Sequence, residues 1–229
     1  MLKGLQSKGK IILIVCLVIT FGILFRVALE KFFHIKHSDD ITPPIDAKDE
    51  ADRLIQKASQ NFFYHEFDQA VENYKRAIVL FEKRKNFNRA ARIYESIGDV
   101  FKFSHNSKEA EKTYLIAIDY HKKLHDKIGE GRAMKRMGDF HMESLRLDKA
   151  GKWFKKATIT VQGVEPHVVK AKIYETQGRY FIKTKRIREA LDSFQKAKDT
   201  YDNTGYPLGY DNISPMIQKL KRSQKNELF

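Results

Sequence analysis

The chain has 229 residues, a formal net charge of +14 and a single cysteine. One cysteine excludes an intrachain disulfide framework and a cysteine-ligated zinc site. Only 5 prolines, against 16 Phe and 10 Tyr, argue against a disordered chain. From residue 51 onward 36 Lys and Arg oppose 23 Asp and Glu, so we expect attraction to acidic partners.

The N-terminal segment is strongly apolar. A basic tail over residues 1–10 precedes residues 11–29, where Arg26 is the only charged residue. As a helix, this segment would extend about 28 Å, close to the thickness of the hydrocarbon core of a bilayer. It predicts an uncleaved transmembrane signal anchor, with a removed signal peptide as the alternative. Lysines ahead of it slightly favour a cytoplasmic N-terminus, so the predicted localisation is a single-pass membrane protein with the following domain on the opposite side.

A predicted linker over residues 30–49, stiffened by Pro43 and Pro44, leads into a part of the chain that repeats itself. Small and aromatic residues recur there with a period of 40 residues. The recurring residues are Ala58, Gly98, Gly138 and Gly178; Ala70, Ala110, Ala150 and Ala190; Tyr74, Tyr114, Phe154 and Phe194; and Ala77, Ala117, Ala157 and Ala197. Alanine, aromatic and alanine at i, i+4 and i+7 share one helix face, so each unit predicts an antiparallel pair of closely packed helices.

This pattern resembles the tetratricopeptide repeat (TPR), whose signature is matched in the units of Gly98, Gly138 and Gly178. The unit of Ala58 departs from it, with Lys57 and Asn61 where the TPR has apolar residues. A period of 40, against about 34 in the usual repeat, is similar to the repeats of kinesin light chain and of SNAP-type adaptors of membrane fusion. The resemblance implies an all-α, right-handed α-solenoid of about four hairpins over residues 50–203, preceded by the transmembrane helix.

Residues 204–229 predict a loop followed by a capping helix. The segment 205–212 contains glycine and tyrosine and is expected to be the loop. Ser214 followed by Pro215 is typical of a helix start, so we expect a short helix over 215–224 that covers the last hairpin.

The TPR resemblance also implies a concave groove, lined by the first helix of each hairpin, that binds peptides or proteins. The family's inward-facing positions, with one further arginine that matches the carboxylate clamp of a TPR subfamily, are in this chain Arg92, Glu95, Asp99, Lys102, Arg132, Lys135, Arg136, Asp139, Lys172, Glu175 and Arg179. Arg92, Arg132 and Lys172 form a basic row suited to acidic side chains or a terminal carboxylate. The alternative is that these are solvated helix charges without a ligand.

No catalytic chemistry is expected. His121 and His125 have a spacing that allows metal chelation, but Lys122 and Lys123 would repel a cation, so a solvated helix face is predicted instead. Motifs of nucleotide-binding loops, serine hydrolases and zinc proteases are absent from the sequence. We therefore expect neither a cofactor nor a metal site.

The favoured function is a membrane-anchored TPR adaptor that binds acidic protein or peptide partners in its groove and recruits them to a membrane complex. The alternative is a basic module whose convex surface binds anionic lipid or, less favoured, nucleic acid.

Overall fold

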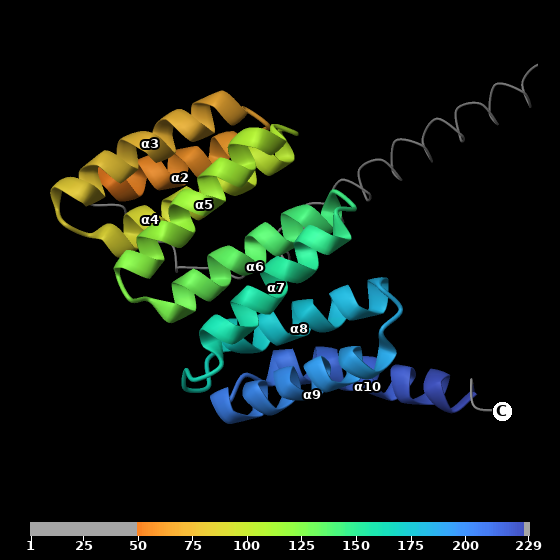
Figure 1. Ribbon diagram of the computed structural model, residues 1–229. Helices are drawn as coiled ribbons and strands as arrows, with labels where there is room; N and C mark the ends of the chain where they lie inside the picture. Colours follow the sequence, from red (N-terminus) through yellow and green to blue (C-terminus); the bar gives the residue numbers. More distant parts are fainter. Residues whose placement is uncertain (1–49, 227–229) are drawn as a thin grey trace, which may run out of the picture. The chain divides into compact units, whose positions relative to one another are not determined.

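The computed structural model describes residues 50–226, which form nine α-helices and no strand (Figure 1). These helices belong to one compact unit of the chain, Lys48–Phe229. Their bounds are α2 (Glu50–Phe63), α3 (Phe67–Lys83), α4 (Phe87–Phe103), α5 (Ser107–Lys123), α6 (Lys127–Glu143), α7 (Leu147–Val161), α8 (Val168–Lys183), α9 (Ile187–Thr204) and α10 (Pro207–Asn226).

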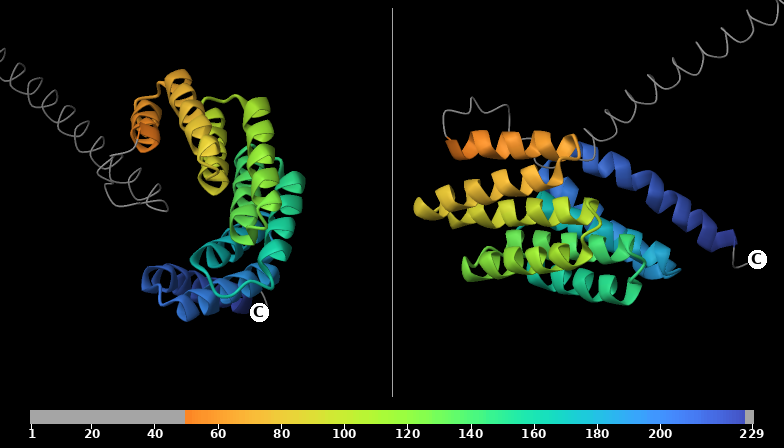
Figure 2. Two further views of the ribbon diagram at one scale, coloured as in Figure 1. Left: turned by 90° about the vertical axis from the view of Figure 1, so that its left-hand side faces the viewer. Right: turned by 90° about the horizontal axis from the view of Figure 1, so that it is seen from above.

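The helices pair and stack in chain order. α2 pairs with α3, α4 with α5, α6 with α7 and α8 with α9, and the second helix of each pair also packs against the first helix of the next. α10 packs against α9 at the end of the stack. The pairs follow one another along an arc, so that the first and last pairs lie on the same side of α6 (Figure 2). The expectation of an all-α helical repeat solenoid is confirmed.

Close contact between a small residue and an aromatic ring holds the two helices of a pair together. A Cβ atom placed on Gly98 would lie 2.5 Å from the ring of Tyr114, and one on Gly138 would lie 2.5 Å from the ring of Phe154. Gly178 and Phe194 make the same contact in the last pair. The repeated alanines around these rings are fully buried, so the small residues occupy the interior as the sequence predicted.

In the first pair, a polar contact replaces part of this apolar packing. Asn61 is buried, and the amide of Asn73 donates to its side-chain oxygen over 3.0 Å. Asn61 in turn donates to Gln69 over 3.0 Å. The amide is therefore tolerated where the TPR pattern has an apolar residue, because its hydrogen bonds are made within the pair.

The helix ends recur every 20 residues, a regularity that the side chains do not reveal. Six residues other than glycine have positive φ, at His65, Lys85, His105, His125, Leu145 and Lys185, and Gly205 has the same conformation. At Leu145 the backbone N–H of Arg146 donates to the carbonyl of His141 over 2.8 Å, and that of Leu145 donates to Met142 over 3.2 Å. This is the Schellman arrangement, which satisfies the last carbonyls of a helix and reverses the chain direction. A longer connection between α7 and α8, which contains Pro166, interrupts the series.

The C-terminal helix begins earlier than predicted. Gly205, at φ 64°, ends α9, and α10 starts at Pro207 and continues through Pro215 to Asn226. The expected loop over 205–212 and the helix start at Ser214 are therefore wrong. Ile213 is fully buried and Ile217 is 6% exposed in the cluster with α9, and this burial offsets the backbone hydrogen bond that Pro215 cannot donate.

The membrane helix in the predicted fold class is corrected. Within residues 50–226, every helix is either too short or too polar to cross a membrane, because each one presents a charged face to water. The predicted anchor over 11–29 lies outside the described residues, as do the tail 1–10 and the linker 30–49. The fold class is therefore an all-α repeat solenoid without a spanning helix in its described part, and the predicted single-pass localisation is withdrawn with it.

Replacing Gly138 by Ala is expected to lower the free energy of unfolding by about 2 kcal/mol, because the new methyl group forces the ring of Phe154 out of its position. Urea unfolding followed by circular dichroism measures the change. Gly163→Ala is the control, since nothing lies within 4 Å of its Cβ position. An unchanged midpoint for Gly138→Ala would contradict the close approach.

Replacing Leu145 by Gly is expected to raise the free energy of unfolding by about 0.5 kcal/mol, because relief of the positive φ exceeds the added chain entropy. Little packing is lost, since Leu145 is 72% exposed. Leu115 is also exposed but lies in the middle of α5, so Leu115→Gly should lower the free energy of unfolding by about 1 kcal/mol. Destabilisation of both variants to the same extent would contradict a strained turn.

Candidate functional site

The first helices of the pairs line the inner side of the arc. α4 contacts α6 and α6 contacts α8, whereas among the described helices α3, α5, α7 and α9 make no comparable contact with one another. In a curved stack the elements that approach one another most closely lie on the inside. The predicted groove residues all belong to α4, α6 and α8. We call this surface the inner face.

Glu95 lies at the middle of a cluster of charged residues on the inner face, although only 1% of the residue is exposed. Its Oε1 lies 2.8 Å from Nε2 of His121 on α5. The guanidinium groups of Arg132 and Arg136 on α6 each donate to Oε2 over 2.9 Å. One carboxylate therefore joins both helices of its own pair to the first helix of the next pair.

The cations around Glu95 keep it ionised. Burial alone would raise its pKa, but the hydrogen bond from His121 and the positive charges of Arg132 and Arg136 outweigh burial and lower the pKa to about 2. A buried carboxylate is stable in this form only when several charged donors surround it. Removing one partner would leave the remaining buried charges less well compensated.

Asp99 extends the network by one helical turn. It pairs with Arg136 and accepts a hydrogen bond from the hydroxyl of Tyr114 over 2.6 Å. Burial raises the pKa of Tyr114, and the negative charge of Asp99 raises it further, so the phenol stays protonated and acts as the donor. Tyr114 is the ring that packs on Gly98, and its polar end therefore joins the ion network while its apolar body fills the core.

His121 also contacts the start of α6. Its Nδ1 lies 3.0 Å from Oδ2 of Asp126, and Oδ1 of Asp126 accepts from the backbone N–H of Gly129 over 2.8 Å. Asp126 thus caps α6 and holds the imidazole in place at once. The predicted solvated face is wrong for His121, which is fully buried. His125 is exposed as expected, although it lies in the turn after α5 and not on the helix.

Most of the remaining predicted residues form separate ion pairs, two within one helix and one between α4 and α6. Lys135 donates to Asp139 over 2.9 Å, and Arg179 donates to Glu175 over 2.7 Å. Lys102 lies 3.2 Å from Glu143. The structure thus brings Glu95, Asp99, Arg132 and Arg136 into one cluster. The basic row is divided, because Arg132 neutralises Glu95, whereas Arg92 is exposed and Lys172 partly buried.

Four partners were not among the predicted site residues: Tyr114, His121 and Tyr201 on the second helices, and Asp126 at the N-terminal cap of α6. A signal for two of them was present. The position four residues after the second alanine of each unit holds Phe81, His121, Val161 and Tyr201, and all four are buried. His121 meets Glu95, and the hydroxyl of Tyr201 donates to Glu175 over 3.0 Å, so the same pair of positions is polar in two hairpins.

Residues 38–164 match the family model described as "Soluble NSF attachment protein, SNAP". The matched range covers more than half of the chain. The chain belongs to the SNAP family. This confirms the helical-repeat resemblance that the sequence indicated, and it makes a protein-binding adaptor or scaffold the class of function that the family supports.

Other comparisons add little to SNAP membership. None of the curated proteins matches the chain. Among solved structures, "Crystal structure of BtubC (BKLC) from P. vanneervenii" is similar, with 11% sequence identity and a TM-score of 0.43 over 78% of this chain and 93% of that one.

Replacing Glu95 by Gln is expected to lower the free energy of unfolding at pH 7 by about 3 kcal/mol, because Arg132 and Arg136 lose the buried carboxylate to which both donate. The folded-state pKa of Glu95 is depressed, so its contribution is complete above the unfolded-state pKa of about 4.5 and disappears as the pH falls toward about 2. The difference between the two proteins should therefore shrink over that range, as measured by urea unfolding at several pH values.

Glu175→Gln is the matched control, because the residue has the same place in its hairpin but a side chain that is 19% exposed. It should change the free energy of unfolding by less than about 1 kcal/mol. Equal effects of the two variants would show that Glu95 is not the central residue of the network.

Proposed function

We propose that this SNAP-family chain is an adaptor whose inner face binds an acidic segment of a partner protein. The observation that carries the proposal is the row of charged side chains on α4, α6 and α8, which face the inside of one arc. The family name describes attachment of one protein to another, namely to NSF. Binding on the inner face and recruitment of the partner to a membrane complex go beyond that name.

Net charge supports an acidic partner. The eleven predicted positions contain seven cations, Arg92, Lys102, Arg132, Lys135, Arg136, Lys172 and Arg179, against four carboxylates. Glu95, one of the four carboxylates, is buried and already neutralised from within. The charge that a partner would meet is therefore positive, which attracts acidic segments and speeds their association.

Rigidity of the face also supports binding. Arg132 and Arg136 are fixed by bonds to Glu95, and Arg136 also by Asp99. A side chain that is already ordered loses less entropy when a partner contacts it. The proposal contains no catalytic step, since binding and colocalisation account for the function of an adaptor.

Charge reversal tests the inner face. The double variant Arg92→Glu/Lys172→Glu changes two inner-face cations without touching Arg132 or Arg136, so the buried network remains intact. Crosslinking recovery of partner proteins from cells should fall at least about tenfold, since charge-assisted contacts are lost and like charges are introduced.

The control is Lys75→Glu/Lys112→Glu, which makes the same change in net charge at exposed positions of α3 and α5. It should leave partner recovery unchanged. Equal recovery with the inner-face variant and the wild type would overturn the proposal. Loss with the control variant alone would instead favour the convex surface, which is the alternative suggested by the sequence.

A further inference from the structure

A cavity of about 550 Å³ lies apart from the inner face, between α7, α8 and the turn that leads into α9. Figure 1 shows α8 lying between α7 and α9 in this part of the stack. The lining residues are Asp148, Gly151, Lys152 and Lys155 of α7, Gln177, Tyr180 and Phe181 of α8, and Arg186 of the turn. None of them is among the predicted groove residues.

Tyr180 supplies a hydroxyl group to this cavity. Only 9% of the residue is exposed, and its ring packs against Phe154 and Phe181 at centroid distances of 5.6 and 5.4 Å. The hydroxyl makes no hydrogen bond to any residue within 50–226. A ligand that accepts a hydrogen bond from this hydroxyl would therefore gain affinity.

Gly151 keeps the hydroxyl accessible. A Cβ atom at this position would collide with the hydroxyl oxygen of Tyr180. At the preceding junction between hairpins, where α5 meets α6, the equivalent positions hold Glu111 and Phe140, so that junction has neither the glycine nor the hydroxyl. The combination therefore belongs to the junction of α7 and α8 and is not a general feature of the repeat.

Three positively charged residues line the same cavity. Lys152 and Lys155 are exposed on α7 and form no ion pair with any residue of the described range. Arg186 stacks on the ring of Phe181 at 4.5 Å, although it is partly neutralised by Glu189 at 2.8 Å. Asp148 is the only carboxylate among the described lining residues.

Gln177 adds a neutral donor. Its side-chain oxygen accepts from the hydroxyl of Thr158 over 3.1 Å, which orients the amide and leaves its NH2 group available. Residues that carry two ammonium groups, a guanidinium, a hydroxyl and an amide therefore line one cavity. A single carboxylate would use only part of these donors.

We propose that this cavity binds the phosphate group of a small phosphate monoester. A phosphate monoester carries nearly two negative charges at neutral pH and three strong acceptor oxygens, which suits two unpaired lysines, one arginine and two neutral donors. The volume is that of a small-molecule site. The site is independent of the inner face, so failure of either proposal leaves the other standing.

Isothermal titration calorimetry of the full-length chain at pH 7.5 tests the proposal, with phenyl phosphate as the probe and phenyl sulfate as an analogue of similar size and lower charge. Phenyl phosphate should bind at one site, at least about fivefold more tightly than phenyl sulfate. Lys152→Ala/Lys155→Ala should weaken phenyl phosphate at least about tenfold. Tyr180→Phe, which keeps the ring and removes the hydroxyl, should weaken it about fivefold.

Lys112→Ala is the matched control. Lys112 occupies on α5 the position of Lys152 on α7, is exposed and lies 3.9 Å from Glu109. This variant should bind phenyl phosphate as the wild type does. Equal weakening by Lys112→Ala and by the double variant would show non-specific attraction and overturn the proposal. Failure of phenyl phosphate to saturate one site would also overturn it, even if a phosphoserine peptide were bound.

Discussion

Rings of tyrosine and phenylalanine lie directly against the backbone of glycine in three successive hairpins, and the rest of the fold depends on this contact. Gly98 faces Tyr114, Gly138 faces Phe154, and in the last pair the equivalent contact has the same geometry. The contact sets how closely two helices approach, and that distance determines which side chains of the next pair can reach them. Because one pair cannot bury its apolar side alone, the pairs stack and the arc follows.

Where the first and second helices of a hairpin face each other, one pair of positions holds polar or charged residues in some hairpins. Glu95 and His121 occupy a pair of positions that hold Lys135 and Val161 in the next hairpin and Glu175 and Tyr201 in the last. Of these three positions, only Glu95 accepts hydrogen bonds from two arginines of the next hairpin, Arg132 and Arg136 of α6. Buried ion pairs of this kind contribute little net stability, but losing one partner is costly, so they fix how hairpins are joined.

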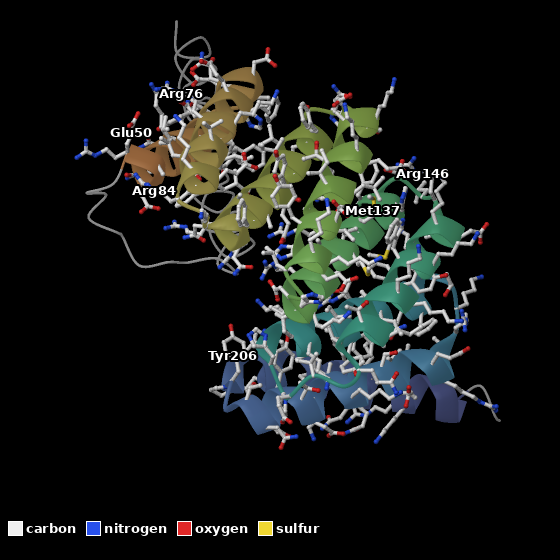
Figure 3. All side chains as sticks on the ribbon, turned by 60° about the vertical axis from the view of Figure 1, so that its left-hand side comes forward. Glu50, Arg76, Arg84, Met137, Arg146 and Tyr206 are labelled. Atoms are coloured by element: carbon white, nitrogen blue, oxygen red, sulfur yellow. The ribbon has the colours of Figure 1, made fainter. Side chains whose placement is uncertain are left out.

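Two surfaces of different chemistry follow from the same stacking. Charged residues of the first helices lie on the inside of the arc, and Figure 2 shows the curvature of the stack. An ion pair outside this cluster joins the two helices of the first hairpin, where Glu50 of α2 lies 4.0 Å from Arg76 of α3 (Figure 3). The cavity beside Tyr180 is an exception, because one glycine removes the side chain that would otherwise fill it.

The sequence by itself determined the all-α repeat, the helix pairs and their buried small and aromatic residues, because a period in side-chain size directly reflects which helix face is buried. Pro215 suggested a helix start at Ser214, whereas α10 continues through this proline. The burial of Ile213 and Ile217 stabilises the longer helix, and this burial arises only in the tertiary structure. The charged site was predicted only in part. Glu95 and Arg132 are far apart in the chain, and whether they face solvent or each other depends on how one hairpin docks on the next. The burial of His121 and the cavity at Gly151 likewise depend on how closely neighbouring helices pack, which the sequence of one helix does not determine.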